Sequence, residues 1–230
     1  MPLLNKYETP LIGIWKIAES WQELLELLTD KNVYYSDVMK ISSDKRKQEW
    51  LAVRLLLQHL SGSDIYIGYR GNGTPYLSGS ACNISISHTK GFAAIILSKN
   101  KNPGIDMEYR SDRAWRLHKK YMCESEWKTI MPTADTDTDA DTDADRVVAT
   151  AAMGITISAA DIATICWCAK ETAFKALGAA DVDFSEHFNI ENFTFSKEGV
   201  LFLKEKRTEQ CRRFRINYRI SDEYILTWKE

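Results

Sequence analysis

The stretch Asn102-Pro103-Gly104-Ile105-Asp106-Met107-Glu108 combines a strand pattern with two closely spaced carboxylates. It follows an apolar run over 92–97 and a short polar turn, so the pattern predicts a strand over 104–108 that begins at the Pro-Gly pair. Side chains two positions apart on a strand share a face, which places Asp106 beside Glu108. Two carboxylates on one face repel unless a cation lies between them, and such oxygen ligands suit Mg²⁺.

The acidic pair needs a partner before it indicates a site. In a chain with 32 acidic residues, an isolated D-x-E triplet is more often solvated surface. The partner segment is 167–175, on a helix expected over about 162–177 that ends at Gly178. Trp167, Glu171 and Lys175 are four residues apart and share one stripe of this helix. Taken alone, Glu171 and Lys175 also fit an ordinary exposed ion pair.

Composition describes an ordinary soluble globular chain. It has 230 residues, 44% hydrophobic and 27% charged, with a net charge of −2, which argues against a generally basic nucleic-acid binder. No apolar run approaches the roughly 20 residues of a membrane helix, and we see no secretory signal. The five cysteines have no zinc-like spacing, so we expect reduced, mostly buried thiols and a cytoplasmic protein without a membrane partner.

The N-terminal part predicts strands and helices in alternation. A strand is expected over 11–17, and Ser20 with Glu23 forms a capping box that opens a helix to residue 28. A longer helix is expected over 44–60, with cations in and near its first turns at positions 45, 46, 47 and 54. Cations at a helix N-terminus oppose the helix dipole, which hints at a compensating anion.

Two further strand patterns precede the acidic stretch. A strand is expected over 64–69. The segments 83–87 and 91–97 are expected to pair as a hairpin, which places Ser87 and His88 at a strand end. A lone Ser-His pair is usually structural, and the G-x-S-x-G context of a hydrolase nucleophile is missing from this sequence.

The segment after the acidic strand is rich in cations. Residues 109–121 predict a helix with the cations on one side, either as a solvated face or as a docking patch for an acidic partner. The cations are Arg110, Arg113, Arg116, Lys119 and Lys120. The tract 133–145 holds six aspartates among Thr and Ala, and we expect it to be a mobile surface insertion.

Strands expected near 193–195, 200–203, 214–220 and 224–228 predict an antiparallel sheet packed on the helix over 162–177. The fold class is therefore α+β. We expect two similar lobes, 1–103 and 104–230, each an antiparallel sheet packed with helices.

With both segments described, the chain resembles the Sfp-type 4′-phosphopantetheinyl transferases. The family has an [IV]-G-[IV]-D-x-E strand followed downstream by W-x-x-K-E-[AST]-x-x-K. Here these stand as Pro103-Gly104-Ile105-Asp106-Met107-Glu108 and Trp167-Cys168-Ala169-Lys170-Glu171-Thr172-Ala173-Phe174-Lys175. Gly73-Thr74-Pro75 and Ser85-Ile86-Ser87-His88-Thr89 resemble the family's G-K-P and N-I-S-H-S, although Thr74 replaces the lysine. The gap between the two main motifs is longer than usual, by roughly the acidic tract.

The resemblance implies a fold and a reaction. The two lobes would be related by a pseudo-twofold in a monomer, with the N-terminal lobe on the side of the adenine and 3′-phosphate of CoA. The phosphopantetheine of CoA would move to a serine of an apo carrier protein, with release of 3′,5′-ADP. Mg²⁺ would be held by Asp106, Glu108 and Glu171, with CoA as co-substrate.

The resemblance also implies parts for single residues. The candidate base would be Glu171 or a metal-bound water. Lys175 would stabilise the leaving phosphate, with Lys170 a weaker candidate for such a cofactor contact. Arg46, Arg54 and His88 would meet the 3′-phosphate and Ser87 a pyrophosphate oxygen. An acidic carrier would dock on Arg113, Arg116 and Lys120.

Three other functions compete with this interpretation. The first is a catalytically silent relative that binds CoA or a carrier protein, against which the complete set of Asp106, Glu108, Glu171 and Lys175 argues. The second is a nucleotide-dependent Mg²⁺ phosphotransferase, although the sequence has no Walker-type or kinase-type glycine loop. The third is an interaction module without chemistry.

Overall fold

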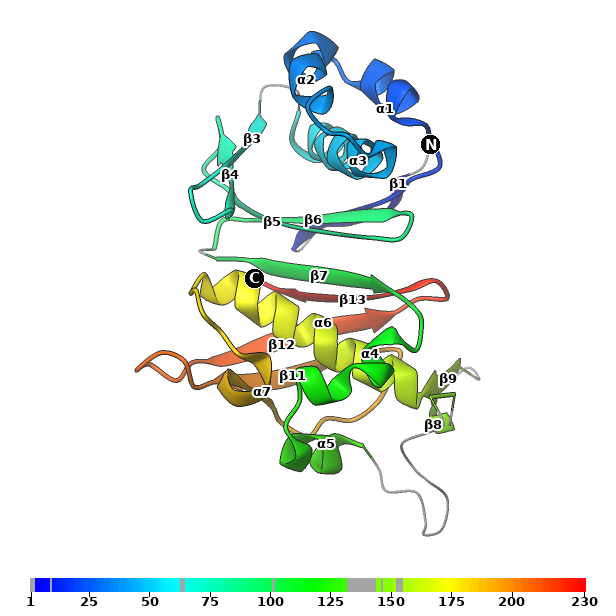
Figure 1. The fold of residues 1–230 in the computed structure, drawn as a ribbon, viewed down its shortest axis with the longest axis vertical. Helices are drawn as coiled ribbons and strands as arrows, with labels where there is room; N and C mark the ends of the chain where they lie inside the picture. Colours follow the sequence, from blue (N-terminus) through cyan, green and yellow to red (C-terminus); the bar gives the residue numbers. More distant parts are fainter. Residues whose placement is uncertain are drawn as a thin grey trace. The chain divides into compact units, whose positions relative to one another are not determined.

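The computed structural model describes residues 3–8, 10–62, 65–100, 102–131, 144–145, 147–151 and 155–230. The chain divides into two compact units, called unit 1 (Met1–Ile105 with Glu230) and unit 2 (Asp106–Lys229). Helices and antiparallel strand pairs occur in both units (Figure 1). The predicted mixture of helices with antiparallel sheets is therefore confirmed.

Unit 1 packs three helices against a four-stranded sheet with the strand order β1-β2-β6-β5. Its helices lie on one face of this sheet, where α3 contacts β2 and β6 (Figure 1). A two-stranded hairpin, β3-β4, lies outside the main sheet. Its elements are β1 (Leu3–Glu8), β2 (Leu11–Lys16), α1 (Trp21–Leu27), α2 (Lys31–Val38), α3 (Asp44–Ser61), β3 (Tyr66–Tyr69), β4 (Pro75–Ser78), β5 (Asn83–Thr89) and β6 (Phe92–Ser98).

Local signals place most of these elements. Ser20 accepts a hydrogen bond from the amide of Glu23, and the Glu23 side chain bonds back to the Ser20 amide, so the predicted capping box opens α1. Ser43 caps α3 in the same manner by accepting from the amide of Arg46. The antiparallel pair β5-β6 confirms the hairpin that alternating apolar residues predicted.

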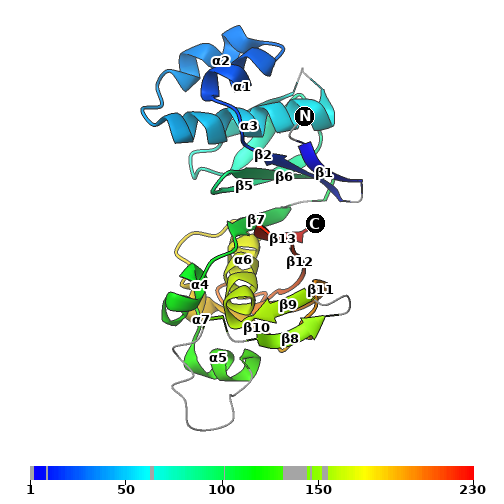
Figure 2. The ribbon, with the colours of Figure 1, turned by 90° about the vertical axis from the view of Figure 1, so that its right-hand side faces the viewer.

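Unit 2 is built on a five-stranded sheet with the order β10-β11-β12-β13-β7. The long helix α6 lies along one face of the sheet and contacts β11, β12 and β13 (Figure 2). Its elements are β7 (Gly104–Tyr109), α4 (Arg113–Arg116), the 3-10 helix η1 (His118–Lys120), α5 (Glu124–Ile130), β8 (Val147–Ala151), β9 (Ile155–Ser158), α6 (Ala159–Leu177), α7 (Phe184–His187), β10 (Phe188–Ile190), β11 (Glu198–Glu205), β12 (Arg213–Ile220) and β13 (Tyr224–Lys229).

The prediction of one helix over 109–121 was wrong, because the segment forms only the short α4 and η1. The buried side chains over 114–122 are Ala114, Trp115, His118, Tyr121 and Met122. They recur at intervals of three and four residues, as they would on a continuous α-helix, so the periodicity does not record the break after Arg116.

Other differences concern the second half of the chain. Residues 193–195 are not a strand; the sheet edge is β10, and Phe193 packs instead on the core through Tyr218. The β8-β9 pair was not expected before α6. Of the acidic tract, residues 133–143 lie outside the described residues.

Apolar side chains form one core in each unit. The expectation that the cysteine thiols are mostly buried is confirmed only in part. All five cysteines are free; Cys166 and Cys168 are buried, whereas Cys211 is exposed. Within the described ranges, no helix combines the length and the apolar character that crossing a membrane requires.

Candidate functional site

Strand β7 presents two carboxylates on the face turned toward α6. Asp106 is buried and Glu108 half-buried, and the intervening Met107 is 1% exposed on the opposite face of the strand. The strand begins directly after Pro103, as the Pro-Gly pair predicted. The alternation of side chains therefore sets the two carboxylates side by side.

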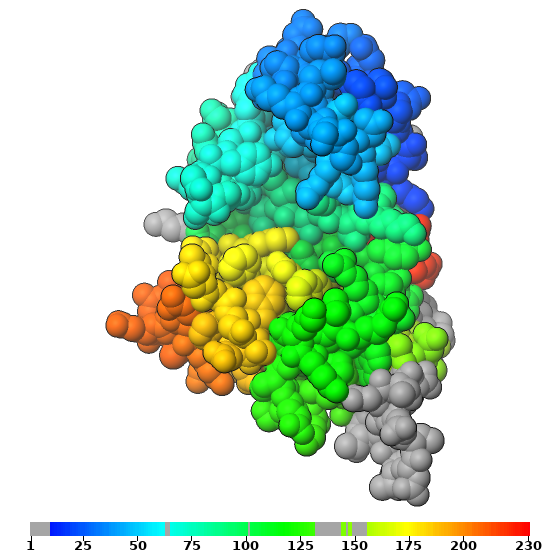
Figure 3. Space-filling view, in the orientation of Figure 1, coloured from blue at the N-terminus to red at the C-terminus, as the bar shows by residue number. Residues whose placement is uncertain are grey.

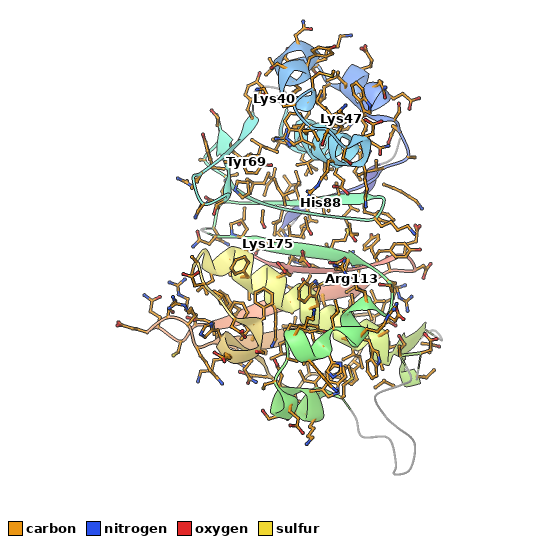
Figure 4. All side chains as sticks on the ribbon, in the orientation of Figure 1. Lys40, Lys47, Tyr69, His88, Arg113 and Lys175 are labelled. Carbon is orange, nitrogen blue, oxygen red and sulfur yellow. The ribbon has the colours of Figure 1, made fainter. Side chains whose placement is uncertain are left out.

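Helix α6 supplies the partner residues. It begins at a capping box, in which Ser158 accepts from the amide of Asp161 and the Asp161 carboxylate bonds back to the Ser158 amide. It ends at Gly178, whose φ of 64° is the left-handed C-cap that favours glycine. Lys175 lies on the last turns of α6 beside β7 (Figure 4).

Two contacts join β7 to the stripe of α6. The Lys175 ammonium donates to Oδ1 of Asp106 at 2.8 Å, and Nε1 of Trp167 donates to Oε1 of Glu108 at 3.3 Å. Trp167 packs edge-on against Tyr121, which fixes the indole. The stripe predicted from the four-residue spacing therefore does meet the acidic strand.

Two further contacts hold α6 in place. The hydroxyls of Thr172 and Thr227 lie 2.6 Å apart and tie the middle of α6 to β13. Arg110, just after β7, forms a two-point ion pair with Asp161 at 2.8 and 2.7 Å. Arg110 thus belongs to an anchor between strand and helix, rather than to the basic face that its spacing indicated.

Glu171 is the most perturbed member of the site. Burial, followed by the charge of Asp106, raises the pKa of Glu171 to about 7; Lys175 opposes the shift and Glu108 adds to it. A carboxyl group with a pKa near neutrality exchanges its proton readily at physiological pH, which suits general acid–base catalysis. Asp106, Glu108, Glu171 and Lys175 thus act on one another as one electrostatic cluster.

The donor set of this cluster fits a hard divalent cation. Three carboxylates are the ligands that Mg²⁺ takes, and they come from a strand and a helix that packing holds rigid. One of these carboxylate oxygens, Oδ1 of Asp106, is already ion-paired with the Lys175 ammonium. Among the residues that the structure describes, no three His, Cys, Asp or Glu side chains are arranged to hold a metal ion.

Lys170 has a structural role instead of the predicted cofactor contact. Its side chain is fully buried, and its ammonium lies 2.7 Å from Oε2 of Glu126. It also donates to the carbonyl oxygens of Tyr121, Phe184 and Phe188, at 2.8, 3.0 and 2.8 Å. With four acceptors inside unit 2, Lys170 organises the segments around α6, and we withdraw it as a ligand contact.

In unit 1, Arg46 and His88 lie near the start of α3. Arg46 is exposed, and Nδ1 of His88 lies 3.5 Å from Oε2 of Glu49, which is three residues after Arg46 on the same side of the helix. Lys45 pairs with Glu49 at 3.9 Å, so this carboxylate compensates part of the cationic first turns.

Arg54 and Ser87 point elsewhere in unit 1. The Arg54 guanidinium is 5% exposed, lies 3.4 Å from the centre of the Trp50 ring and donates to the Trp50 carbonyl. Burial lowers the pKa of Arg54, and Tyr69 opposes that shift through a hydrogen bond. Ser87 is buried and, as the neighbour of His88 on β5, points to the other face of the sheet. Arg54 is therefore engaged along its own helix, and Ser87 and His88 face opposite sides of the sheet.

The proposed docking cations lie on the surface of α4 and η1. Arg113, Arg116 and Lys120 are exposed, and α4 and η1 (green) lie at the surface of unit 2 on the face that Figure 3 shows. Arg116 pairs with Asp112, one turn earlier. The charge of this patch is therefore partly compensated within the chain.

Sequence reasoning did not find the supporting residues Glu126, Asp161 and Thr227. Each acts through a partner 44 to 55 positions away along the chain. Trp167 could be identified from the sequence, because it lies one turn before Glu171 on the same stripe of the helix.

A comparison with protein families completes the description of the site. The model of the family described as ACPS, the 4′-phosphopantetheinyl transferase superfamily, matches residues 102–228, more than half of the chain. This range includes Asp106, Glu108, Glu171 and Lys175. No curated protein matches the chain significantly.

Proposed function

Because the chain belongs to the 4′-phosphopantetheinyl transferase superfamily, we propose that it transfers the 4′-phosphopantetheine arm of CoA to a serine of an apo carrier protein. Family membership indicates phosphopantetheinyl transfer in general, and the carrier protein as acceptor is our inference. The observation that carries the proposal is the cluster of Asp106, Glu108, Glu171 and Lys175 within the matched range.

The reaction breaks a phosphoanhydride bond and forms a phosphodiester bond. The serine Oγ of the carrier attacks the phosphorus that bears the pantetheine arm, and the bond from this phosphorus to the bridging oxygen of the diphosphate breaks. The products are the phosphopantetheinylated serine and 3′,5′-ADP, which leaves with the bridging oxygen. Such transfers need positioning and charge neutralisation more than covalent participation of the protein.

The residues of the cluster match these needs. Glu171 accepts the proton of the serine hydroxyl. The Lys175 ammonium, one turn further along α6, neutralises charge on the departing phosphate. Asp106, Glu108 and Glu171 would hold Mg²⁺, which when bound neutralises charge on the diphosphate oxygens.

Arg46 and His88 are the contacts that we propose for the 3′-phosphate of CoA. Arg46 offers an exposed guanidinium, and Nδ1 of His88 lies 3.5 Å from Glu49, which is on the same helix as Arg46. Arg54 is already engaged with Trp50, and we no longer count it among these contacts.

Intact mass measurement tests the proposed transfer. The full chain is incubated with CoA, Mg²⁺ and a panel of apo carrier proteins, and one carrier should gain the mass of phosphopantetheine while 3′,5′-ADP appears. The exposed Lys128→Ala is a matched control that should retain this activity. Binding of CoA without a mass gain on any carrier would instead identify a catalytically silent relative.

A further inference from the structure

The ion pair of Asp106 with Lys175 engages one of the carboxylates that we propose as metal ligands. Oδ1 of Asp106 accepts from the Lys175 ammonium at 2.8 Å, and the two side chains are 8% and 27% exposed. A carboxylate oxygen bound to an ammonium is not available in the same direction to a divalent cation. Among the described residues, no group of three His, Cys, Asp or Glu side chains is arranged to hold a metal ion.

The Lys175 ammonium and a divalent cation compete for the same carboxylates because both are positively charged. The cluster holds three carboxylates, and Lys175 acts on Glu171 as a positive charge against the negative charges of Asp106 and Glu108. A dication placed among these carboxylates repels an ammonium that touches one of its ligands, and partial burial weakens the screening of that repulsion. We therefore expect the two cations to compete for Asp106.

The lysine is the cation that is able to move. Its ammonium is a compact charge on a flexible four-carbon chain, and its side chain is the more exposed of the pair. Asp106, in contrast, is fixed within β7. Displacement would release the ammonium while its Cα stays on α6, one turn from Glu171.

We propose that Lys175 is a displaceable internal counter-cation: it holds Asp106 while no divalent cation is bound, and it is released toward the phosphate of CoA when the cation binds. This inference rests on the proposed function, because it concerns the same acidic cluster. It adds that the metal and the phosphate-binding lysine are loaded in sequence, so metal binding prepares the site for CoA.

Lysine labelling of the wild-type chain tests the release directly. The full chain is treated with a small amine-acetylating reagent in chelator and in Mg²⁺, without CoA, and acetylation of each lysine is measured by peptide mass spectrometry. Acetylation of Lys175 should increase several-fold with Mg²⁺, because ion pairing protects an amine. The exposed Lys128 and the buried Lys170 are controls that should not respond.

Metal affinity supplies a second measurement. Titration calorimetry with Mg²⁺ should give tighter binding for Lys175→Met, by about tenfold or more in Kd, because the competing cation is gone. Lys175→Arg should bind Mg²⁺ no better than the wild type, since a guanidinium pairs with Asp106 at least as well.

The outcomes separate this inference from the proposed function. Unchanged labelling of Lys175 in Mg²⁺, equal or weaker metal binding by Lys175→Met, or no Mg²⁺ binding at all would each overturn the displacement. The mass gain on an apo carrier tests transfer independently, because that measurement is made on the wild-type chain.

Discussion

The Lys170 ammonium and the Glu126 carboxylate lie 2.7 Å apart with both side chains completely buried. Oε1 of Glu126 also accepts from the amide of Ile190 at 2.6 Å. Burial raises the pKa of Glu126, and Lys170 opposes that shift. The pair therefore joins α5, α6 and β10, the strand at one edge of the sheet, through one set of hydrogen bonds.

Removing one partner should destabilise unit 2 strongly. Lys170→Met leaves the Glu126 carboxylate buried without its counter-ion, and we expect the free energy of unfolding to fall by about 3–5 kcal/mol. The double variant Lys170→Met with Glu126→Gln should lose clearly less, because no charge is stranded. Denaturant unfolding at pH 7 measures both. Equal losses in the single and double variants would show that the ion pair is not the cause.

The raised pKa of Glu171 predicts how stability depends on pH. The folded protein binds this proton more tightly than the unfolded chain, so the cost of ionising Glu171 grows as pH rises from 4.5 to about 7 and is complete above that. Without divalent cations, Glu171→Gln should therefore stabilise the protein by about 2 kcal/mol at pH 8 and by little at pH 4.5.

Thermal unfolding at both pH values checks this prediction, with the exposed Glu209→Gln as the control. A gain from Glu171→Gln that is the same at pH 4.5 and pH 8 would mean that ionisation of Glu171 is not its source.

Asp106→Ala should abolish transfer by removing a proposed metal ligand. We expect kcat to fall by at least about 100-fold, as for other losses of charge stabilisation in a transition state. The measurement is holo-carrier formation in saturating Mg²⁺, with far-UV circular dichroism to confirm folding. Wild-type turnover by a folded Asp106→Ala variant would refute the metal assignment.

Charge reversal on α4 should affect the carrier and not CoA. In Arg113→Glu with Arg116→Glu, KM for the carrier should rise by about tenfold, because an acidic partner loses its electrostatic attraction. KM for CoA should change little. Steady-state kinetics with each substrate varied in turn decides the question, and equal increases in both KM values would count against a docking face.

Deleting residues 136–143 should leave activity near normal, because we expect this part of the acidic tract to be a surface insertion outside the proposed catalytic cluster. The measurement is kcat/KM for holo-carrier formation. A large loss in a variant whose thermal unfolding is unchanged would give the tract a part in catalysis or in carrier binding.

Short-range patterns predicted much of this structure. The facing of Asp106 and Glu108 follows from strand alternation, and the ends of α6 follow from a serine cap and a glycine C-cap. The meeting of β7 with α6 was inferred only through the family resemblance, because strand and helix lie some 60 residues apart in sequence.

The remaining misjudgements share one physical cause. In the sequence, Lys170 and Arg110 look like cations that bind a ligand or lie on the surface. In the structure, Lys170 pairs with Glu126 and Arg110 pairs with Asp161. Whether a charge is buried with a partner depends on packing between distant segments, and no local periodicity records it. Arg54 is a similar case, because only the folded helix shows its stacking on Trp50.

Asp161 has two attachments, since it closes the capping box of α6 and holds Arg110 at the end of β7. The first turn of the helix cannot fray without loosening the strand that carries Asp106 and Glu108. We therefore expect the amide hydrogens of both elements to exchange with solvent through one shared opening event, so that loss of the acid pair and of the catalytic helix would be cooperative.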